Sequence, residues 1–331
     1  MELKENWLKQ GYVDESISNI DNLEESFAKL KKEKNAVLMA HFYQDDLIQD
    51  IADFVGDSLA LAQFAAKTDA DIIMVAGVHF MGETAKILSP KKTVLVPDLN
   101  AGCSLADSCP PDEFEKFINQ YPDHKVVTYV NTSAEIKALS DIVVTSTNAK
   151  AIVDSFPADE KLIFGPDRNL GNYINGITGR EMILWDGACH VHEKFSLEKI
   201  LELKKENPDA EILTHPECKK PLLMVSDHVG STASLLNYSQ SSSSNKFIVA
   251  TEAGILHQMQ LKSPDKVFIP APPNDSTCAC NECEFMRLNT MQKIYNALKY
   301  SWPTVEVEED VRVKAVKPIE RMLDISAKLK L

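Results

Sequence analysis

The sequence predicts an α/β protein built from three homologous parallel-sheet domains in a pseudo-threefold arrangement around a central cavity. Two observations predict it. Short apolar runs rich in Val and Ile alternate with segments of helical spacing, which is typical of buried parallel strands connected by helices. The runs also recur as a larger unit, because three polar clusters at strand ends, which contain His41, Tyr129 and His215, stand 88 and 86 residues apart.

The composition is that of an ordinary soluble globular protein. The 331 residues suffice for two or three domains, with 44% hydrophobic and 25% charged residues. The 35 Lys and Arg against 49 Asp and Glu give a net charge of −14, which disfavours nucleic acid and anionic membranes as partners. The segment MELKENWLKQ lacks the apolar core of a signal peptide, and the apolar runs are far shorter than the roughly 20 residues of a membrane span. We therefore expect a cytoplasmic protein.

The individual elements follow from local patterns. The first 35 residues predict one or two helices that are charged on one face. Ten apolar runs predict strands, which begin near residues 36, 72, 93, 126, 142, 162, 182, 211, 247 and 267. Between them, capping residues and helical spacing predict helices, for example over 111–121 and 196–206. In the tail, two amphipathic helices flank an acidic stretch that begins at Val305, which we expect to be a solvated connector.

Four features recur in the same order and predict the three repeats. The first strand of each repeat ends in a polar cluster, and a hydroxyl follows 17 residues later: Ser58 after His41, Ser146 after Tyr129 and Thr232 after His215. A strand-to-helix turn comes next. The fourth feature is a strand that runs into a cysteine loop, with Cys103, Cys189 and Cys283 in the three repeats. The predicted domains are accordingly 1–122, 123–208 and 209–331.

These features all lie where strands end. In parallel α/β units the loops at the carboxyl ends of strands share one crevice, where ligands bind. Three cysteines, two histidines, a tyrosine and three hydroxyls are therefore expected to face a central cavity. A single hydroxyl at a helix start is more often an N-cap, and a lone histidine is more often a structural hydrogen-bonding residue. The recurrence of these features in register favours ligand binding.

The cysteines point to a metal centre rather than to disulfides. Seven cysteines without an export signal do not suggest a disulfide framework. Thiolates bind iron–sulfur clusters or zinc, and the spacing of Cys103, Cys189 and Cys283 does not choose between them. A cluster on three cysteines would leave one iron open to polarise a substrate oxygen. The remaining cysteines are interpreted as structural or are given no role: Cys109, Cys218, Cys278 and Cys280.

The chain resembles the quinolinate synthase family over nearly its whole length. The matching segments are AHFYQ (40–44), VGDSLALA (55–62), GVHFMGETAKIL (77–88), AGCSLAD (101–107), YVN (129–131), PDRNLG (166–171), CHVHEKF (189–195), HPEC (215–218), VGSTA (229–233), ATEAGILH (250–257) and CEFMRLNT (283–290). Phe42 and Gly82 depart mildly from the family's pattern. The family's fold is three homologous α/β domains around a central cavity, in agreement with the repeats.

The resemblance implies a reaction and a cofactor. Members of the family condense iminoaspartate (iminosuccinate) with dihydroxyacetone phosphate to give quinolinate, phosphate and water in de novo NAD biosynthesis. The implied cofactor is one 4Fe–4S cluster per chain on Cys103, Cys189 and Cys283, whose open iron acts as a Lewis acid in dehydration. The implied partners are these small-molecule substrates, with a functional link to L-aspartate oxidase or aspartate dehydrogenase.

The resemblance also implies a substrate pocket. The residues that match it are His41, Ser58, Tyr129, Asn131, Ser146, His215, Glu217 and Thr232 and, with less defined roles, Tyr43, Phe80, Met81 and His192. Among them, Glu217 is the candidate general base, with a pKa that we expect to be raised in a cavity shared with anions. His41 and His215 would contact substrate or move a proton. Tyr43 and Tyr129 would supply phenolic protons.

Three other functions stay open on the sequence alone. A related three-domain cluster protein could dehydroxylate an isoprenoid diphosphate reductively, which would require an electron donor. A zinc enzyme could use Cys189, His192 and nearby carboxylates. A non-enzymatic α/β scaffold would carry its thiols only as small buried side chains.

Overall fold

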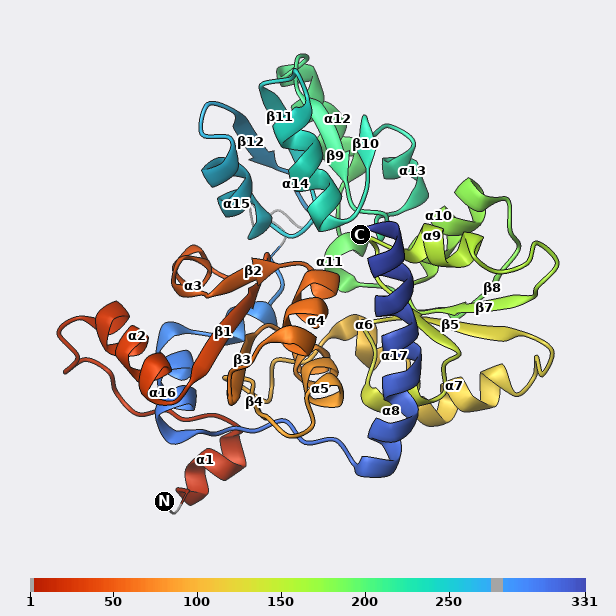
Figure 1. The fold of residues 1–331 in the computed structure, drawn as a ribbon. Helices are drawn as coiled ribbons and strands as arrows, with labels where there is room; N and C mark the ends of the chain where they lie inside the picture. Colours follow the sequence, from red (N-terminus) through yellow and green to blue (C-terminus); the bar gives the residue numbers. More distant parts are fainter. Residues whose placement is uncertain (1–2, 275–281) are drawn as a thin grey trace. The chain divides into compact units, whose positions relative to one another are not determined.

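The computed structural model describes residues 3–274 and 282–331, so Cys278 and Cys280 lie outside the described residues (Figure 1). Within that part of the chain, twelve strands form three four-stranded sheets whose strand pairings are all parallel. This confirms the predicted α/β class with three parallel sheets. The chain divides into two compact units, Met1–Cys103 with Glu284–Val313 and Ser104–Cys283 with Lys314–Leu331.

The first unit holds one sheet. Its strands are β1 (Ala36–His41), β2 (Phe54–Gly56), β3 (Ile72–Ala76) and β4 (Thr93–Leu95). Its helices are α1 (Glu5–Gln10), α2 (Leu23–Glu33), α3 (Asp46–Ile51), α4 (Ser58–Lys67), α5 (His79–Leu88) and α16 (Met291–Tyr300), with a 3-10 turn at Met286–Leu288. Strand β1 forms because its side chains are apolar up to His41. Leu38 in β1 packs in a buried cluster with Phe27 of α2 and Leu298 of α16.

The acidic stretch in the tail is not a solvated connector at its start, so that prediction is wrong for Val305. Thr304 forms an antiparallel bridge with Leu95 at the end of β4. The amide of Val305 donates to the carbonyl of Val94 at 2.9 Å, and Val305 is 1% exposed. The charge of the glutamates beside Val305 suggested solvent, whereas its own apolar side chain is buried beside the first sheet.

The second unit holds the other two sheets. The strands of the second sheet are β5 (Lys125–Tyr129), β6 (Ile142–Val144), β7 (Leu162–Gly165) and β8 (Ile183–Leu184). Those of the third sheet are β9 (Glu211–Thr214), β10 (His228–Val229), β11 (Lys246–Ala250) and β12 (Val267–Pro270). The helices are α6 (Ser104–Asp107), α7 (Pro111–Ile118), α8 (Ala134–Ala138), α9 (Ala149–Asp154), α10 (Arg168–Thr178), α11 (His190–Glu193), α12 (Leu197–Glu206), α13 (Lys220–Leu223), α14 (Thr232–Ser241), α15 (Ile255–Lys262) and most of α17 (Glu309–Leu329).

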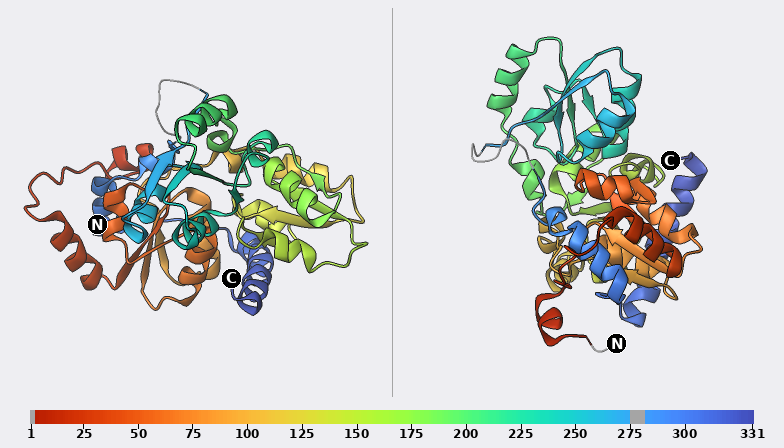
Figure 2. Two further views of the ribbon diagram at one scale, coloured as in Figure 1. Left: turned by 90° about the horizontal axis from the view of Figure 1, so that it is seen from above. Right: turned by 90° about the vertical axis from the view of Figure 1, so that its left-hand side faces the viewer.

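Helices cover both faces of the third sheet. Helix α12 packs on one face, where Ile200 joins Ile212 and Ile248 in a buried cluster, while α14 and α15 lie on the other face (Figure 2). A parallel sheet buried on both faces needs continuous apolar strands, which is why this part of the sequence carries unbroken Val and Ile runs. No helix within 3–274 and 282–331 is long and apolar enough to cross a membrane.

All three sheets share one strand order, in which the first strand of the repeat lies between the second and the third. The orders are β2-β1-β3-β4, β6-β5-β7-β8 and β10-β9-β11-β12. In such sheets the crevice for ligands lies beyond the carboxyl ends of the first and third strands, where the direction of winding changes. Two strands, β2 and β10, were absent from the sequence prediction, because their segments FVG and HV carry only two and one apolar side chains and have no apolar neighbours that would extend them into a run.

Candidate active site

A cluster of buried polar side chains lies at the strand ends of the second unit. Tyr129 is the last residue of β5, and His215 and Glu217 follow β9 directly. His192 comes from the short helix α11. All four side chains are buried, with exposures of 2–4%. The structure therefore brings together four of the residues singled out in the sequence, from the second and third repeats.

Glu217 is the centre of this cluster. The hydroxyl of Tyr129 donates to its Oε1 at 2.7 Å. Nδ1 of His192 lies 3.0 Å from Oε2, and Nδ1 of His215 lies 3.7 Å from Oε1. The two imidazole rings stack on each other with centroids 4.7 Å apart. One carboxylate is thus enclosed by a phenol and two imidazoles.

The expectation that the pKa of Glu217 is raised is wrong. Burial by itself raises it, but the charges of His192 and His215, together with hydrogen bonds from His192 and Tyr129, lower the pKa to about 2. Glu217 is therefore an ionised carboxylate at neutral pH. A carboxylate of such low basicity is suited to orienting a phenol and to stabilising an imidazolium rather than to holding a proton itself.

The outer nitrogens of the two imidazoles have hydroxyl partners. Nε2 of His192 lies 3.0 Å from Oγ1 of Thr251, and Nε2 of His215 lies 3.3 Å from Oγ of Ser146. Thr251 is the first residue after β11 and was not singled out from the sequence. The one sequence feature that could have identified Thr251 is its position at a strand end, in the segment ATEAG. The five side chains form a continuous chain of polar contacts through Glu217.

The three hydroxyls in register are not the N-caps of the helices that follow them. The N-cap residues of α4, α9 and α14 are Asp57, Asn148 and Ser231. Ser58 and Thr232 are the first helical residues of α4 and α14, and Ser146 lies in the turn before α9. The hydroxyl of Thr147 donates to that of Ser231 at 2.9 Å, so the turns that carry Ser146 and Thr232 meet. Helix capping does not account for the recurrence of these three hydroxyls.

Asp167 is a second buried carboxylate that the sequence analysis missed. It is the N-cap of α10, and its Oδ1 accepts hydrogen bonds from the amides of Asn169 and Leu170. Its Oδ2 accepts from the amide of Cys189 at 3.0 Å. Burial and the charge of Glu217 raise the pKa of Asp167 to about 7. The available signal was an aspartate two residues after a buried strand and immediately before a helix.

The five cysteines that the structure describes fall into two groups. Cys103, Cys189 and Cys283 are partly exposed, Cys103 in the first unit and the other two in the second. Cys109 and Cys218 are buried among apolar side chains. Burial raises the pKa of Cys109 to about 12 and that of Cys218 well above the ordinary value. These two thiols are poor metal ligands, because a ligand must be a thiolate.

One group of side chains in the second unit could hold a metal ion directly. The sulfur of Cys189, a ring nitrogen of His192 and a carboxylate oxygen of Glu217 all lie within 4.8 Å of one another. Thiolate, imidazole and carboxylate are all zinc ligands. However, His192 and Glu217 already contact each other, so a metal in this group would replace that contact.

The first unit holds four further pocket residues proposed from the sequence, which are His41, Tyr43, Phe80 and Met81, whereas Asn131 lies in the second unit, two residues after β5. His41 is the last residue of β1 and is 5% exposed. Its Nδ1 accepts from the amide of Tyr43 at 3.2 Å, and the two rings are 4.5 Å apart. Phe80 and Met81 are buried in the first turn of α5. These residues again follow the first and third strands of a sheet, as the strand order requires.

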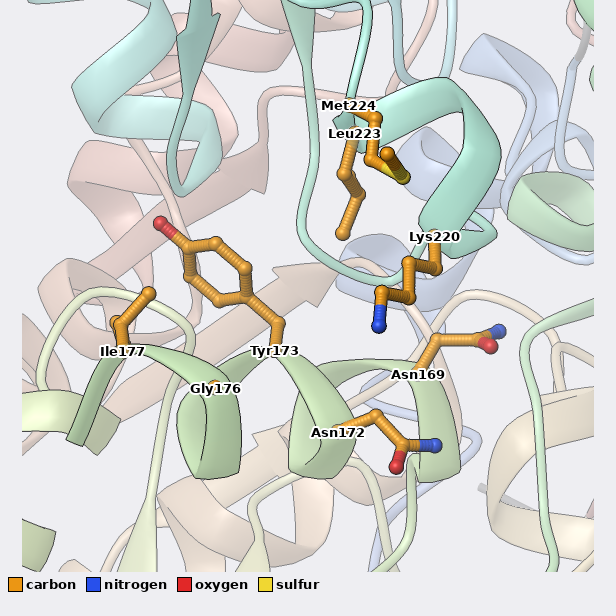
Figure 3. A pocket seen from close by; sticks show the side chains of 8 residues that line it. All are labelled: Asn169, Asn172, Tyr173, Gly176, Ile177, Lys220, Leu223 and Met224. Atoms are coloured by element: carbon orange, nitrogen blue, oxygen red, sulfur yellow. The ribbon is translucent and has the colours of Figure 1, made fainter. Parts of the chain in front are cut away.

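A groove of about 430 Å³ lies between α10 and α13 (Figure 3). The amine of Lys220 and the side chains of Asn169 and Asn172 line one end, and Ile177 and Met224 line an apolar part. The side-chain Nδ2 of Asn169 also donates to Oε1 of Glu193 at 2.7 Å and to the backbone carbonyl of Glu217 at 3.0 Å. The groove is of a size that suits a small molecule, and Asn169 connects it to the segment that carries Glu217.

Comparison with known proteins covers nearly the whole chain. A family described as "Quinolinate synthetase A protein" matches residues 25–324. A quinolinate synthase of Thermosynechococcus vestitus is 60% identical over 297 residues, which is 90% of this chain and 93% of the relative. A quinolinate synthase of Trichodesmium erythraeum is 56% identical over 318 residues, which is 96% of this chain and 98% of the relative.

Proposed function

Because this chain belongs to the quinolinate synthetase A family, we propose that it condenses iminoaspartate with dihydroxyacetone phosphate to give quinolinate, phosphate and water. The observation that carries the proposal is the buried carboxylate of Glu217 between Tyr129, His192 and His215. A condensation followed by dehydration requires protons to move between carbon, nitrogen and oxygen atoms. A phenol and two imidazoles around one anion provide groups for that work.

We propose that a 4Fe–4S cluster is held by Cys103, Cys189 and Cys283. The donor set fits it, since these three thiols are partly exposed whereas Cys109 and Cys218 are buried with raised pKa values. When bound, a cluster with three protein ligands supplies an open iron that acts as a Lewis acid in dehydration. We further propose that the three repeats, 1–122, 123–208 and 209–331, surround a central cavity that contains this centre.

Recognition of the substrates must be local, because they are anions and the protein carries a net charge of −14. Ser58 and Thr232 place their hydroxyls in the first turns of α4 and α14, at the positive ends of the helix dipoles, an arrangement that suits carboxylate or phosphate. His41 and His215 would add hydrogen bonds to substrate. Oδ1 of Asn131 is buried without a hydrogen-bond partner among the described residues, so it is suited to accept an N–H or O–H of the substrate.

The chemistry divides into four stages. The triose phosphate loses phosphate, the enamine form of iminoaspartate makes the carbon–carbon bond, an imine closes the ring, and water leaves. In this scheme the hydroxyl of Tyr129 donates to Glu217 and so presents its oxygen to the substrate, while the imidazoles of His192 and His215 beside the carboxylate move protons. Glu217 itself stays ionised because its pKa is about 2. The stages involve no net oxidation or reduction, so no electron donor is required.

An anaerobic reconstitution tests this function. The protein is supplied with iron and sulfide, the visible spectrum and metal content are recorded, and both substrates are then added. We expect about four irons per chain and the formation of quinolinate. A loaded cluster without quinolinate would contradict the reaction but not the cofactor. Reductant-dependent turnover of an isoprenoid diphosphate, without formation of quinolinate, would favour the reductive cluster enzyme.

A mononuclear zinc site is the second candidate, and the Cys189, His192 and Glu217 group favours it. Metal analysis after anaerobic purification separates the two. One zinc per chain that depends on His192 would support this alternative. Iron and sulfide in equal amounts that persist in His192→Ala would contradict it, because His192 is not a proposed cluster ligand.

A further inference from the structure

Two buried carboxylates hold the backbone amides of two cysteines at equivalent places in the second and third repeats. Asp167 lies two residues after β7, and Glu252 lies two residues after β11. Oδ2 of Asp167 accepts from the amide of Cys189 at 3.0 Å, and Oε1 of Glu252 accepts from the amide of Cys283 at 3.1 Å. Both side chains are buried, with exposures of 0% and 1%.

The two oxygens of each carboxylate accept hydrogen bonds from different segments of the chain. Oδ1 of Asp167 binds the first amides of α10, and Oε2 of Glu252 binds the amide of Gly254 at 2.7 Å. Each carboxylate thus connects the segment after the third strand to the cysteine loop after the fourth strand. A serine would cap a helix with one oxygen and without the cost of burying a charge. The contact with the cysteine amide is what requires the second oxygen.

The first repeat is built differently. Two residues after β3 stands Val78, which has no side-chain oxygen. The contact is therefore not a general requirement of this fold, because the same strand order forms without a carboxylate in the first sheet. Its presence in the second and third repeats coincides with Cys189 and Cys283, which we propose as cluster ligands.

We propose that Asp167 and Glu252 are positioning residues that set Cys189 and Cys283 for metal binding, an inference that rests on the proposed cluster. A hydrogen bond on the amide of a ligand residue restricts its backbone and hence the direction of its Cα–Cβ bond. Thiolates that are preorganised in the binding geometry bind a metal centre more tightly than thiolates on a flexible loop. Loss of such outer partners lowers metal affinity by about 10- to 100-fold in known metal sites.

Asp167→Ser tests the proposal most sharply. Serine keeps an oxygen that can cap α10 but leaves nothing to accept from Cys189. Ser196→Ala is the matched control, because it removes the buried N-cap of α12 without touching a cysteine. Glu252→Ala tests the second contact, with Glu211→Ala in the same repeat as its control. This pair also tests the proposal if Asp167→Ser does not fold.

Two measurements are made on each variant. Hydrogen exchange of peptides that contain Cys189 or Cys283 is measured on the apoprotein, and iron release to a chelator is measured on the reconstituted protein. We expect exchange at the affected cysteine and iron release to be at least about tenfold faster than in wild type and in the controls.

Unchanged exchange, or faster exchange with wild-type iron release, would overturn the proposal. Wild-type protein that takes up no iron and sulfide would instead refute the proposed cluster, and the positioning role would fall with it. The behaviour of the wild type thus distinguishes the two failures.

Discussion

Glu217 is ionised because of its neighbour His215 and of two side chains that lie far from it in the sequence. Tyr129 is 88 residues before it, and His192 lies in a different repeat. A buried carboxylate without such partners would take up a proton instead. The same residues that set its charge are those proposed to move protons, so changes at this site affect stability and activity together.

The pH dependence of stability should reveal this environment. The folded-state pKa of Glu217, about 2, lies below its ordinary value of 4.5. Glu217 therefore stabilises the fold above its ordinary pKa, and this contribution is lost as the pH falls toward 2. We expect the melting temperature of the apoprotein to fall more steeply between about pH 5 and pH 3 in wild type than in Glu217→Gln. Parallel curves for the two proteins would contradict the lowered pKa.

Thr251 should contribute to turnover through His192. In Thr251→Val a methyl group replaces the hydroxyl that lies 3.0 Å from Nε2 of His192. Loss of one buried hydrogen bond of about 1 kcal/mol predicts a kcat reduced about fivefold, with KM little changed. Thr251→Ser keeps the hydroxyl and should restore most of kcat. Equal losses in the two variants would show that packing, and not the hydrogen bond, is responsible.

Among the elements, helix α5 depends on a residue that departs from the family's pattern. Gly82 lies where a Cβ atom would meet Val96 at 2.5 Å and Val305 at 2.9 Å. Both neighbours are buried, and Val305 is held beside β4 by its amide. The close approach of α5 to this part of the first unit explains why glycine occurs here despite its low helix propensity.

Gly82→Ala should therefore destabilise the protein although alanine favours helices. Overpacking of this kind costs about 1–3 kcal/mol, which exceeds the gain of about 1 kcal/mol in helix propensity. Gly176→Ala in α10 is the matched control, because a Cβ there meets nothing within 4 Å. We expect a lower melting temperature for Gly82→Ala and an equal or higher one for Gly176→Ala. A rise in both would contradict the tight packing of α5.

At the scale of the whole molecule, the five cysteines within 3–274 and 282–331 separate by environment rather than by sequence spacing. The candidate ligands are partly exposed at strand-end loops, and Cys109 and Cys218 lie in apolar cores. A thiolate is disfavoured in an apolar core, so burial alone predicts which thiols take part in metal binding.

Single cysteine-to-alanine variants should reproduce this division. After anaerobic reconstitution, Cys103→Ala, Cys189→Ala and Cys283→Ala should lose most of the iron bound by wild type. Cys109→Ala and Cys218→Ala should keep it, with a melting temperature lowered by the small cavity that each change leaves. Iron loss in Cys218→Ala at an unchanged melting temperature would contradict the structural role of that thiol.

The sequence by itself determined the three parallel sheets, ten of their twelve strands and the candidate ligand cysteines. These follow from apolar runs, helical spacing and recurrence, which are properties of neighbouring residues. Only the tertiary structure decided the lowered pKa of Glu217, the contacts of Asp167, Thr251 and Glu252, and the burial of Val305. Each of these depends on residues distant in sequence that folding brings into contact, and no local pattern encodes the burial or the charge that results.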